Sequence, residues 1–306
     1  MSQALVFSEY GGPEVLRVVD VPVPAPGPGE VRVRVRAAGA QPFDNLFRGG
    51  GAREWAPASF DRGGGPQRLG NEAAGVVDAV GEGAGRFAVG DEVLGWCNGA
   101  FAEYVAVPEG HLARKPAGMP WAEAGALTAS GQTAHTALSD LDVKPGETLL
   151  VHAAAGGVGS YAVQIAVAWG ARVVGTASAR NHEYLRSLGA TPVAYGPGLA
   201  ERVGEVAERV DVSFDAVATG ESLRVGAALA PGRAGTVASN PLAGELGVRQ
   251  LGTVRTPERL EDLVALYAAG KLRVEVAGTF PLTRAAEAMR ELAAGHVRGK
   301  VVLTPG

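Results

Sequence analysis

The glycine-rich stretch at residues 152–159 carries the residue types and spacing that point most directly to chemistry. It reads His152-Ala153-Ala154-Ala155-Gly156-Gly157-Val158-Gly159, and it lies between an apolar run that predicts a strand and a run that predicts a helix. In that context the turn brings a pyrophosphate to the helix N-terminus, where free N–H groups bind anions. Gly156 lets the backbone approach the phosphates, and Gly159 lets the helix pack on the strand. We predict cofactor contacts from Ala154, Ala155, Gly156, Gly157, Val158 and Gly159; the alternative is a glycine turn that binds nothing.

The end of the next predicted strand, residues 172–176, bears on the choice of cofactor. An NAD site needs an acidic residue here to accept a hydrogen bond from the ribose 2′-hydroxyl, and no acid lies between Val173 and Asn181. Ser178 and Arg180 suit a 2′-phosphate instead, because a guanidinium binds phosphate oxygens bidentately. Tyr195, at the end of the third strand, could lie along the same phosphate. We therefore predict NADP(H); the alternative is that Arg180 begins the next helix in solvent.

The segments on either side of this turn predict an α/β chain with a β-rich part and a part in which strands and helices alternate. Residues 1–120 read as many short strands with glycine punctuation, and residues 31–36 alternate Val and Arg as a half-buried strand does. Such strands predict a barrel or sandwich. Between about 122 and 272, strands alternate with helices, which predicts a parallel sheet. The last residues resemble the first part of the chain again. They predict a strand near residues 273–276, a helix near 284–294 and a strand at 299–303.

Composition excludes several classes of protein. The 306 residues carry a net charge of −4, so the chain lacks the basic balance of a general nucleic-acid or membrane-surface binder. The single cysteine, Cys97, excludes an internal disulfide framework and suits a reducing compartment, so we expect a cytoplasmic protein. The uncharged stretch from Ala153 to Ala171 is long enough to span a bilayer, but its glycines favour a buried strand–turn–helix.

The chain resembles the medium-chain dehydrogenase/reductase superfamily, specifically its zinc-free quinone oxidoreductase branch, over essentially its whole length. The resemblance rests on ordered segments at residues 11–16, 70–77, 89–93, 133–134, 153–159, 187–190 and 299–303. It implies a GroES-like β-barrel catalytic domain at residues 1–122 and 273–306, and a Rossmann domain with a doubly wound parallel sheet at residues 123–272. It also implies a homodimer through the Rossmann edge strands, and cofactor contacts near the nicotinamide from Thr133, Ala218, Asn240, Leu251 and Thr253.

Departures from the zinc-dependent members of this superfamily are informative. Those members place a catalytic cysteine where this chain has Gly39-Ala40-Gln41, and a histidine where it has Asn71. Their four-cysteine structural loop is absent as well. Zinc needs three protein ligands at a catalytic site or four at a structural one, and Cys97 alone does not provide them. We therefore expect no metal.

The resemblance then predicts hydride transfer from NADPH to a quinone or to an α,β-unsaturated carbonyl. Without a metal, neutral donors must meet the charge that develops on the substrate oxygen, and Gln41, Asn45 and Asn71 are the candidates. A flat conjugated substrate would stack on aromatic residues of the cleft-forming segments, for which core packing is the alternative; these are Phe43, Phe47, Trp55 and Trp96. An enoyl-thioester reductase and a non-catalytic NADPH-binding protein remain alternative functions.

Overall fold

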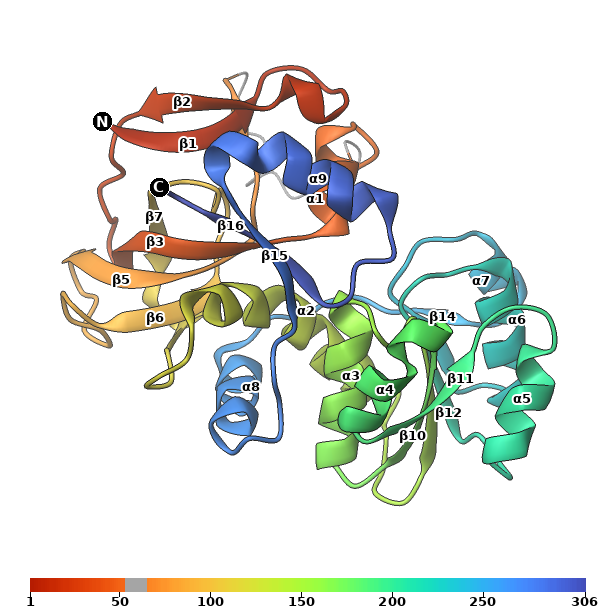
Figure 1. The fold of residues 1–306 in the computed structure, drawn as a ribbon. Coiled ribbons are helices and arrows are strands. Elements are labelled where there is room, and N and C mark those ends of the chain that lie inside the picture. Colours follow the sequence, from red (N-terminus) through yellow and green to blue (C-terminus); the bar gives the residue numbers. More distant parts are fainter. Residues whose placement is uncertain (53–64) are drawn as a thin grey trace. The chain divides into compact units, whose positions relative to one another are not determined.

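The chain divides into two compact units, which are described separately. Unit 1 comprises Met1–Ala129, Thr256–Val264 and Val274–Gly306, and unit 2 comprises Ser130–Arg255 and Ala265–Arg273. The computed structural model describes residues 1–52 and 65–306 (Figure 1). A boundary was expected at residue 122, but helix α2 (Trp121–Asp140) runs without a break through that point, and the units divide inside it after Ala129. Helix α8 (Pro257–Ala268) is divided in the same way.

Unit 1 is built on two sheets. The larger has the order β15-β16-β3-β5-β6-β8, with β7 also pairing with β3, and the smaller has the order β2-β1-β4. The strands are β1 (Ser2–Phe7), β2 (Arg17–Val21), β3 (Glu30–Ala40), β4 (Gln67–Arg68), β5 (Glu72–Val80), β6 (Glu92–Trp96), β7 (Tyr104–Pro108), β8 (Leu112–Arg114), β15 (Val276–Pro281) and β16 (Lys300–Thr304). The expected alternation in β3 is confirmed, because Val31, Val33 and Val35 are buried while Arg34 and Arg36 are exposed.

Two short helices complete the described part of unit 1's core. Helix α9 (Ala285–Ala294) buries Ala288 and Met289 against the same apolar cluster that contains Phe47 of α1 (Pro42–Arg48). The helix expected near residues 284–294 is therefore present. The strand expected near residues 273–276 instead begins at Val276, where β15 pairs in parallel with β16.

Unit 2 is built on one parallel sheet with the order β11-β10-β9-β12-β13-β14. Its strands are β9 (Thr148–His152), β10 (Arg172–Ala177), β11 (Ala190–Ala194), β12 (Val212–Asp215), β13 (Ala234–Thr236) and β14 (Arg249–Gln250). All of β9 is buried, as expected for a continuous apolar run inside a parallel sheet. The order reverses direction between β9 and β12, and in open α/β sheets ligands bind at that reversal, beside the carboxyl ends of the strands.

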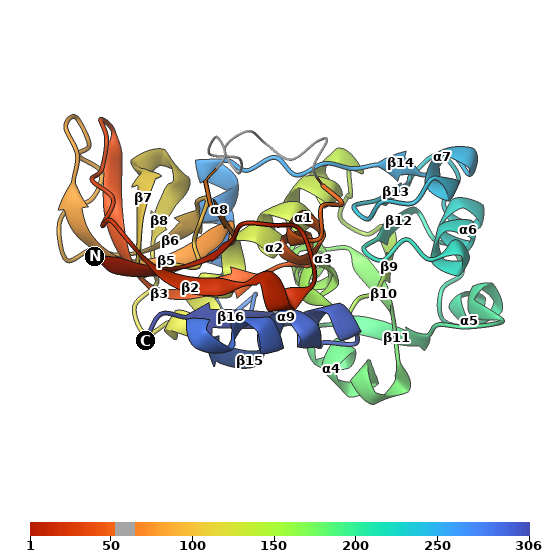
Figure 2. The same cartoon turned by 90° about the horizontal axis from the view of Figure 1, so that it is seen from above.

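Helices cover both faces of the unit 2 sheet, which makes it doubly wound. Figure 2 shows α3 on one side of the strands and α5 and α6 on the other. The helices are α3 (Gly157–Ala168), α4 (His182–Ser187), α5 (Leu199–Val206), α6 (Gly220–Leu229) and α7 (Leu242–Glu245). Leu150, Val174 and Val193 of three adjacent strands pack against α5 through Leu199 and Val203. The predicted α/β class with a Rossmann-type sheet is confirmed.

The uncharged stretch after β9 also has the expected form. It follows the strand directly and contains the glycine turn and helix α3, whose residues from Gly159 to Ala166 are buried in protein. Within the part of the chain that the structure describes, no helix has both the length and the apolar character needed to cross a membrane.

Candidate active site

The glycine turn joins the carboxyl end of β9 to the first turn of α3. Ala153 adopts a left-handed conformation with φ of 55°, and the N–H of Ala154 donates to the Thr176 carbonyl of β10 at 3.0 Å. A Cβ atom on Gly159 would lie 2.2 Å from the Ala153 carbonyl oxygen, so only glycine fits this approach of helix to strand. Helix α3 begins at Gly157, and its first N–H groups have no partners within the helix. The turn can therefore hold an anion at the helix N-terminus.

The predicted phosphate residues follow the two strands beside this turn. Ala177 and Ala194 pair at the ends of β10 and β11, so Ser178 and Tyr195 leave the sheet from neighbouring positions. Ser178 precedes a short 3₁₀ helix (Ala179–Asn181) and accepts a hydrogen bond from the Asn181 side chain at 3.3 Å. Tyr195 and Arg180 are exposed. The carboxyl ends of β10 and β11 are therefore followed by a hydroxyl, a guanidinium and a phenol. No carboxylate lies between Val173 and Asn181.

The residues predicted near the nicotinamide lie after β12 and β13, beyond β14 and, for Thr133, in helix α2. Asn240 donates from Nδ2 to the Ala218 carbonyl at 2.8 Å, and Ala218 has a left-handed φ of 53°. The Leu251 N–H donates to the Thr236 carbonyl at 2.8 Å. The hydroxyls of Thr133 and Thr253 lie 3.0 Å apart. Unit 2 thus joins four of these predicted residues into two hydrogen-bonded pairs, Ala218 with Asn240 and Thr133 with Thr253, while Leu251 binds the backbone of β13.

In unit 1, Gln41 lies beside a buried ion pair. Its Nε2 donates to Glu72 Oε1, and the Lys300 ammonium lies 3.0 Å from the same oxygen. The second Glu72 oxygen accepts from the Ala129 N–H at 2.7 Å. Glu72 and Lys300 have side chains only 1% and 3% exposed. Such a pair is stable only when both charges have hydrogen-bond partners, and here the carboxylate accepts from an ammonium, an amide side chain and a backbone N–H.

Asp44 joins the two segments that carry the predicted substrate donors. Its carboxylate accepts from the Gln41 N–H at 2.7 Å and from the Gly70 N–H at 3.0 Å, directly before Asn71. Burial raises the pKa of Asp44 to about 6, although the two backbone hydrogen bonds oppose that shift. One side chain therefore sets the positions of both Gln41 and Asn71.

The three predicted donors differ in how their amides are used. Asn71 is 5% exposed, and its Oδ1 is buried with no hydrogen-bond partner among the described residues. Asn45 donates to the Met289 carbonyl at 3.0 Å and accepts from Arg48 at 2.8 Å, so its amide joins α1 to α9. The unpartnered Oδ1 of Asn71 is an acceptor, so a ligand that completes its hydrogen bonding must donate to it.

The predicted substrate aromatics have partners within unit 1. Phe43 stacks on Phe47 with ring centroids 6.1 Å apart, and Phe47 is 2% exposed inside the core. Trp96 stacks on His111 with centroids 4.4 Å apart. These contacts are what core packing produces. Trp55 lies outside the described residues.

Sequence reasoning assigned no role to Glu72, Lys300 or Asp215. Glu72 and Lys300 both lie in the segments that carry the family resemblance, and each begins a strand whose next residues are apolar. An isolated charge in such a strand signals burial with a partner, but it does not name the partner. Asp215 ends a buried strand and is 2% exposed.

His152 was expected to be a packed histidine, and the structure shows it 1% exposed at the end of β9. Its Nδ1 lies 3.4 Å from the Thr176 hydroxyl. Burial lowers the pKa of His152 to about 4, so the ring is neutral at neutral pH. Its Nε2 has no hydrogen-bond partner in the described part of the chain.

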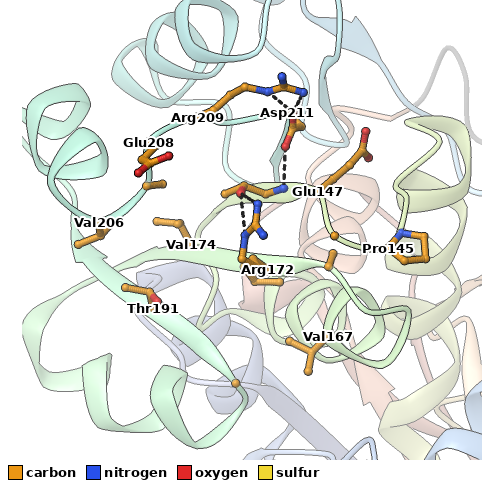
Figure 3. Close-up of a pocket in the computed structure, with 16 residues that line it drawn as sticks. Pro145, Glu147, Val167, Arg172, Val174, Thr191, Val206, Glu208, Arg209 and Asp211 are labelled. Carbon is orange, nitrogen blue, oxygen red and sulfur yellow. Dashed lines mark hydrogen bonds and ion pairs between the residues drawn. The ribbon is translucent and has the colours of Figure 1, made fainter.

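A separate cavity of about 870 Å³ lies at the amino-terminal ends of the unit 2 strands, opposite the glycine turn (Figure 3). Its lining includes Thr148 and Arg172, the first residues of β9 and β10. Arg172 donates to the Thr148 hydroxyl at 3.2 Å, and the Thr148 N–H donates to Asp211 at 2.9 Å. These polar groups bind one another and tie the strand starts together, away from the carboxyl ends where cofactors bind.

The residues present do not fit a zinc site. Within residues 1–52 and 65–306, no three His, Cys, Asp or Glu side chains lie close enough together to hold a metal ion. Zinc needs at least three such ligands. The amides of Gln41 and Asn71 are not zinc ligands of this kind, so no step of the chemistry below uses a metal.

Family models match both parts of the chain. Residues 27–117 match the model described as "Alcohol dehydrogenase GroES-like domain", and residues 188–303 match the one described as "Zinc-binding dehydrogenase". A quinone oxidoreductase from Pseudomonas aeruginosa is 35% identical over the full length of both chains. An NADPH-dependent alkenal/one oxidoreductase from Arabidopsis thaliana is 32% identical over 99% of this chain and 79% of its own length. Pikromycin polyketide synthase component PikAII from Streptomyces venezuelae is 36% identical over 78% of this chain, which spans only 7% of that protein.

Solved structures agree with these matches. The quinone oxidoreductase from Coxiella burnetii superposes with a TM-score of 0.87 at 29% identity, covering 100% of this chain and 99% of its own. The CurK enoyl reductase superposes with the same TM-score at 27% identity, covering 100% and 99%. The chain belongs to the medium-chain dehydrogenase/reductase superfamily, in its quinone oxidoreductase-like branch. It is therefore an oxidoreductase of a family that uses a nicotinamide cofactor.

Proposed function

We propose that the protein is an NADPH-dependent reductase that transfers hydride, without zinc, to a quinone or to an α,β-unsaturated carbonyl. The observation that carries the cofactor choice is the end of β10, where Ser178 and Arg180 stand and no carboxylate is present. A carboxylate there would repel a 2′-phosphate, whereas a hydroxyl and a guanidinium donate to it. Tyr195 leaves the neighbouring strand and adds a third polar group.

In this proposal the cofactor supplies the reducing hydride from C4 of the nicotinamide. Transferred to the quinone or to the β-carbon of the enone, that hydride would leave negative charge on the substrate oxygen. Gln41 and Asn71 would donate hydrogen bonds to that oxygen, and water would supply the proton that completes the reduction. Asn71 would donate from Nδ2, because its buried Oδ1, which has no hydrogen-bond partner among the described residues, only accepts. Gln41 and Asn45 each already donate from the amide nitrogen, to Glu72 and to Met289, so a substrate oxygen would use the second N–H of either amide.

Steady-state assays test the reaction. NADPH oxidation should be fast with 1,4-benzoquinone or a small enone and slow with an enoyl thioester. With each substrate, the oxidation of NADH should be slower than that of NADPH. Arg180→Ala should raise the KM for NADPH by about tenfold and leave that for NADH nearly unchanged, since about 1.4 kcal/mol of phosphate binding is lost. Equal effects on both cofactors would contradict the phosphate assignment.

An enoyl-thioester reductase is the second candidate. It is favoured by the likeness to the CurK enoyl reductase and to a polyketide synthase component. Turnover of the enoyl thioester well above that of the quinone and the enone would select this reading. Failure of all three substrates despite NADPH binding would select a non-catalytic NADPH-binding protein.

We also propose a cytoplasmic homodimer, formed through the edge strand β14 of the unit 2 sheet. Edge strands expose unpaired N–H and C=O groups that a second copy can satisfy. Light scattering on the purified protein gives the mass directly. A monomer at all concentrations would refute the dimer.

A further inference from the structure

The segment between β12 and α6 is held by one carboxylate oxygen. Asp215 Oδ1 accepts hydrogen bonds from the Val217 N–H at 2.8 Å, from the Ala218 N–H, and from the Thr236 hydroxyl at 3.2 Å. Asp215 Oδ2 is buried and has no hydrogen-bond partner in the described part of the chain. All of the hydrogen bonding of this buried carboxylate is therefore directed at one loop and one neighbouring strand.

The same segment is held from its other side. Asn240 donates to the Ala218 carbonyl at 2.8 Å, and its own Oδ1 accepts from the Leu242 N–H at 3.0 Å. Side chains from β12 and from the turn after β13 thus bind both the N–H and the carbonyl of Ala218. Half-exposed Val217 and buried Ala218 form a backbone corner with little freedom to move.

The backbone conformation shows that this hold is needed. Among residues 1–52 and 65–306, the non-glycine residues with positive φ are Asp142, Ala153, Ala218 and His296. Ala153 and Ala218 follow β9 and β12, which are neighbours in the sheet, with His152 paired to Asp215. A left-handed alanine persists only where its surroundings over-determine it, and such residues cluster at ligand sites.

Strand order indicates which part of the cofactor meets this corner. Strand β9 lies between β10 and β12, and the glycine turn follows β9. If the 2′-phosphate lies at Ser178 beyond β10 and the pyrophosphate at the turn, the rest of the dinucleotide extends over β12. This step rests on the proposed function. The nicotinamide riboside half then reaches the backbone at Val217 and Ala218.

We propose that Asp215, together with Thr236 and Asn240, is a positioning residue that fixes the Val217–Ala218 backbone for the nicotinamide half of the cofactor. The adenosine half binds beyond β10 and does not depend on this corner. Asp215 therefore contributes to affinity for NADPH but not to affinity for the adenosine portion alone.

The test compares two ligands on matched variants. NADPH and 2′-phospho-ADP-ribose, which lacks nicotinamide, are titrated into the full chain by calorimetry. Asp215→Ala should weaken the binding of NADPH by about tenfold or more, because several hydrogen bonds to the corner are lost. The affinity for 2′-phospho-ADP-ribose should stay within about twofold of that of the wild type. Asp215→Asn is the conservative control, because an amide oxygen can keep all the bonds to Oδ1 while the amide nitrogen takes the place of the unpartnered Oδ2. It should keep NADPH affinity within about threefold.

A second substitution separates the corner from the general stability of the sheet. Glycine adopts the left-handed conformation without a steric cost, so Ala218→Gly added to Asp215→Ala should restore part of the NADPH affinity. If Asp215→Ala does not fold, Asn240→Ala, in which only the carbonyl side of the corner is released, should weaken NADPH selectively.

The outcomes separate this inference from the proposed function. Equal losses for both ligands, or no loss in the alanine variants, would overturn the positioning role and leave NADPH binding intact. If the wild-type protein bound neither ligand, the proposed function and this inference would fail together.

Discussion

The candidate sites of unit 1 and unit 2 are formed by different kinds of groups. In unit 1, the buried groups are charged side chains: Glu72 and Lys300, which begin two strands, form an ion pair, and Asp44 of α1 binds two backbone N–H groups. In unit 2, the site edge is made of backbone, with the glycine turn after β9 and the left-handed corner at Ala218 after β12. The site in unit 1 requires each buried charge to have a partner. The turn in unit 2 requires small residues, because a larger side chain would clash with the backbone there.

The difference follows from what each unit would bind. A dinucleotide carries its own charges, so a sheet edge with free N–H groups and little side-chain bulk suits it. A neutral quinone or enone offers only a carbonyl oxygen, so directed donors such as Gln41 must be held rigidly. Perturbing the two units should therefore produce different signatures.

The largest expected effect is the loss of Lys300. In Lys300→Met, the Glu72 carboxylate stays buried without its counter-charge, which should cost about 3–5 kcal/mol of the free energy of unfolding. The double variant Glu72→Gln with Lys300→Met buries no charge and should be less destabilised than Lys300→Met alone. Urea unfolding of the wild type, both single variants and the double variant gives the coupling. Additive losses would show that the two charges do not interact.

The pH dependence should have opposite signs in the two units. The folded pKa of His152, about 4, is below its ordinary value of 6.5, so the unfolded chain binds a proton first as the pH falls. The stability that His152 contributes is present above pH 6.5 and is lost as the pH falls toward 4. Relative to His152→Asn, the wild type should lose about 2–3 kcal/mol between neutral pH and about pH 4.

Asp44 supplies the contrasting case in unit 1. Its folded pKa, about 6, is above its ordinary value of 3.8, so the folded chain binds the proton first. Relative to Asp44→Asn, the wild type should therefore gain stability as the pH falls from about 6 to 4. Urea titrations across this range measure both differences. Curves of the same sign for the two variants would contradict the assignment of at least one pKa.

A smaller effect is expected from a single methyl group in the glycine turn. Gly159→Ala places a Cβ against the Ala153 carbonyl and should cost about 1–3 kcal/mol, with weaker NADPH binding. Gly204→Ala is the matched control, because a Cβ there meets nothing within 4 Å in the interior of α5. It should stabilise the protein slightly through helix propensity. Thermal unfolding and NADPH titration of both variants make the comparison; similar losses would exclude the steric explanation.

The smallest effect is expected at an ion pair on the surface of unit 1. Arg86 and Glu261 pair with side chains 36% and 57% exposed. Glu261→Gln should change the free energy of unfolding by less than about 1 kcal/mol, and less again at high salt. A loss as large as that of Lys300→Met would show that burial does not distinguish the two pairs.

Several elements escaped sequence reasoning for a physical reason. Helix α2 (Trp121–Asp140) was not predicted, because its middle residues, from Ala124 to Thr133, are nearly all buried and so show no apolar stripe with helical period. Helix α1 (Pro42–Arg48) is too short for periodicity to appear. Burial on all sides removes the signal that patterning depends on.

The order of residues along the chain was enough to determine the strand–turn–helix at residues 148–168, the alternation in β3 and the chemistry at the end of β10. Those features depend on neighbours within a few positions, where spacing and side-chain type act directly. Contacts between distant segments needed the folded chain: Glu72 meets Lys300, Asp44 joins Gln41 to Gly70, and Asp215 and Asn240 hold Ala218. A local pattern can show that a charge is buried, but only the pairing of strands decides which partner it meets.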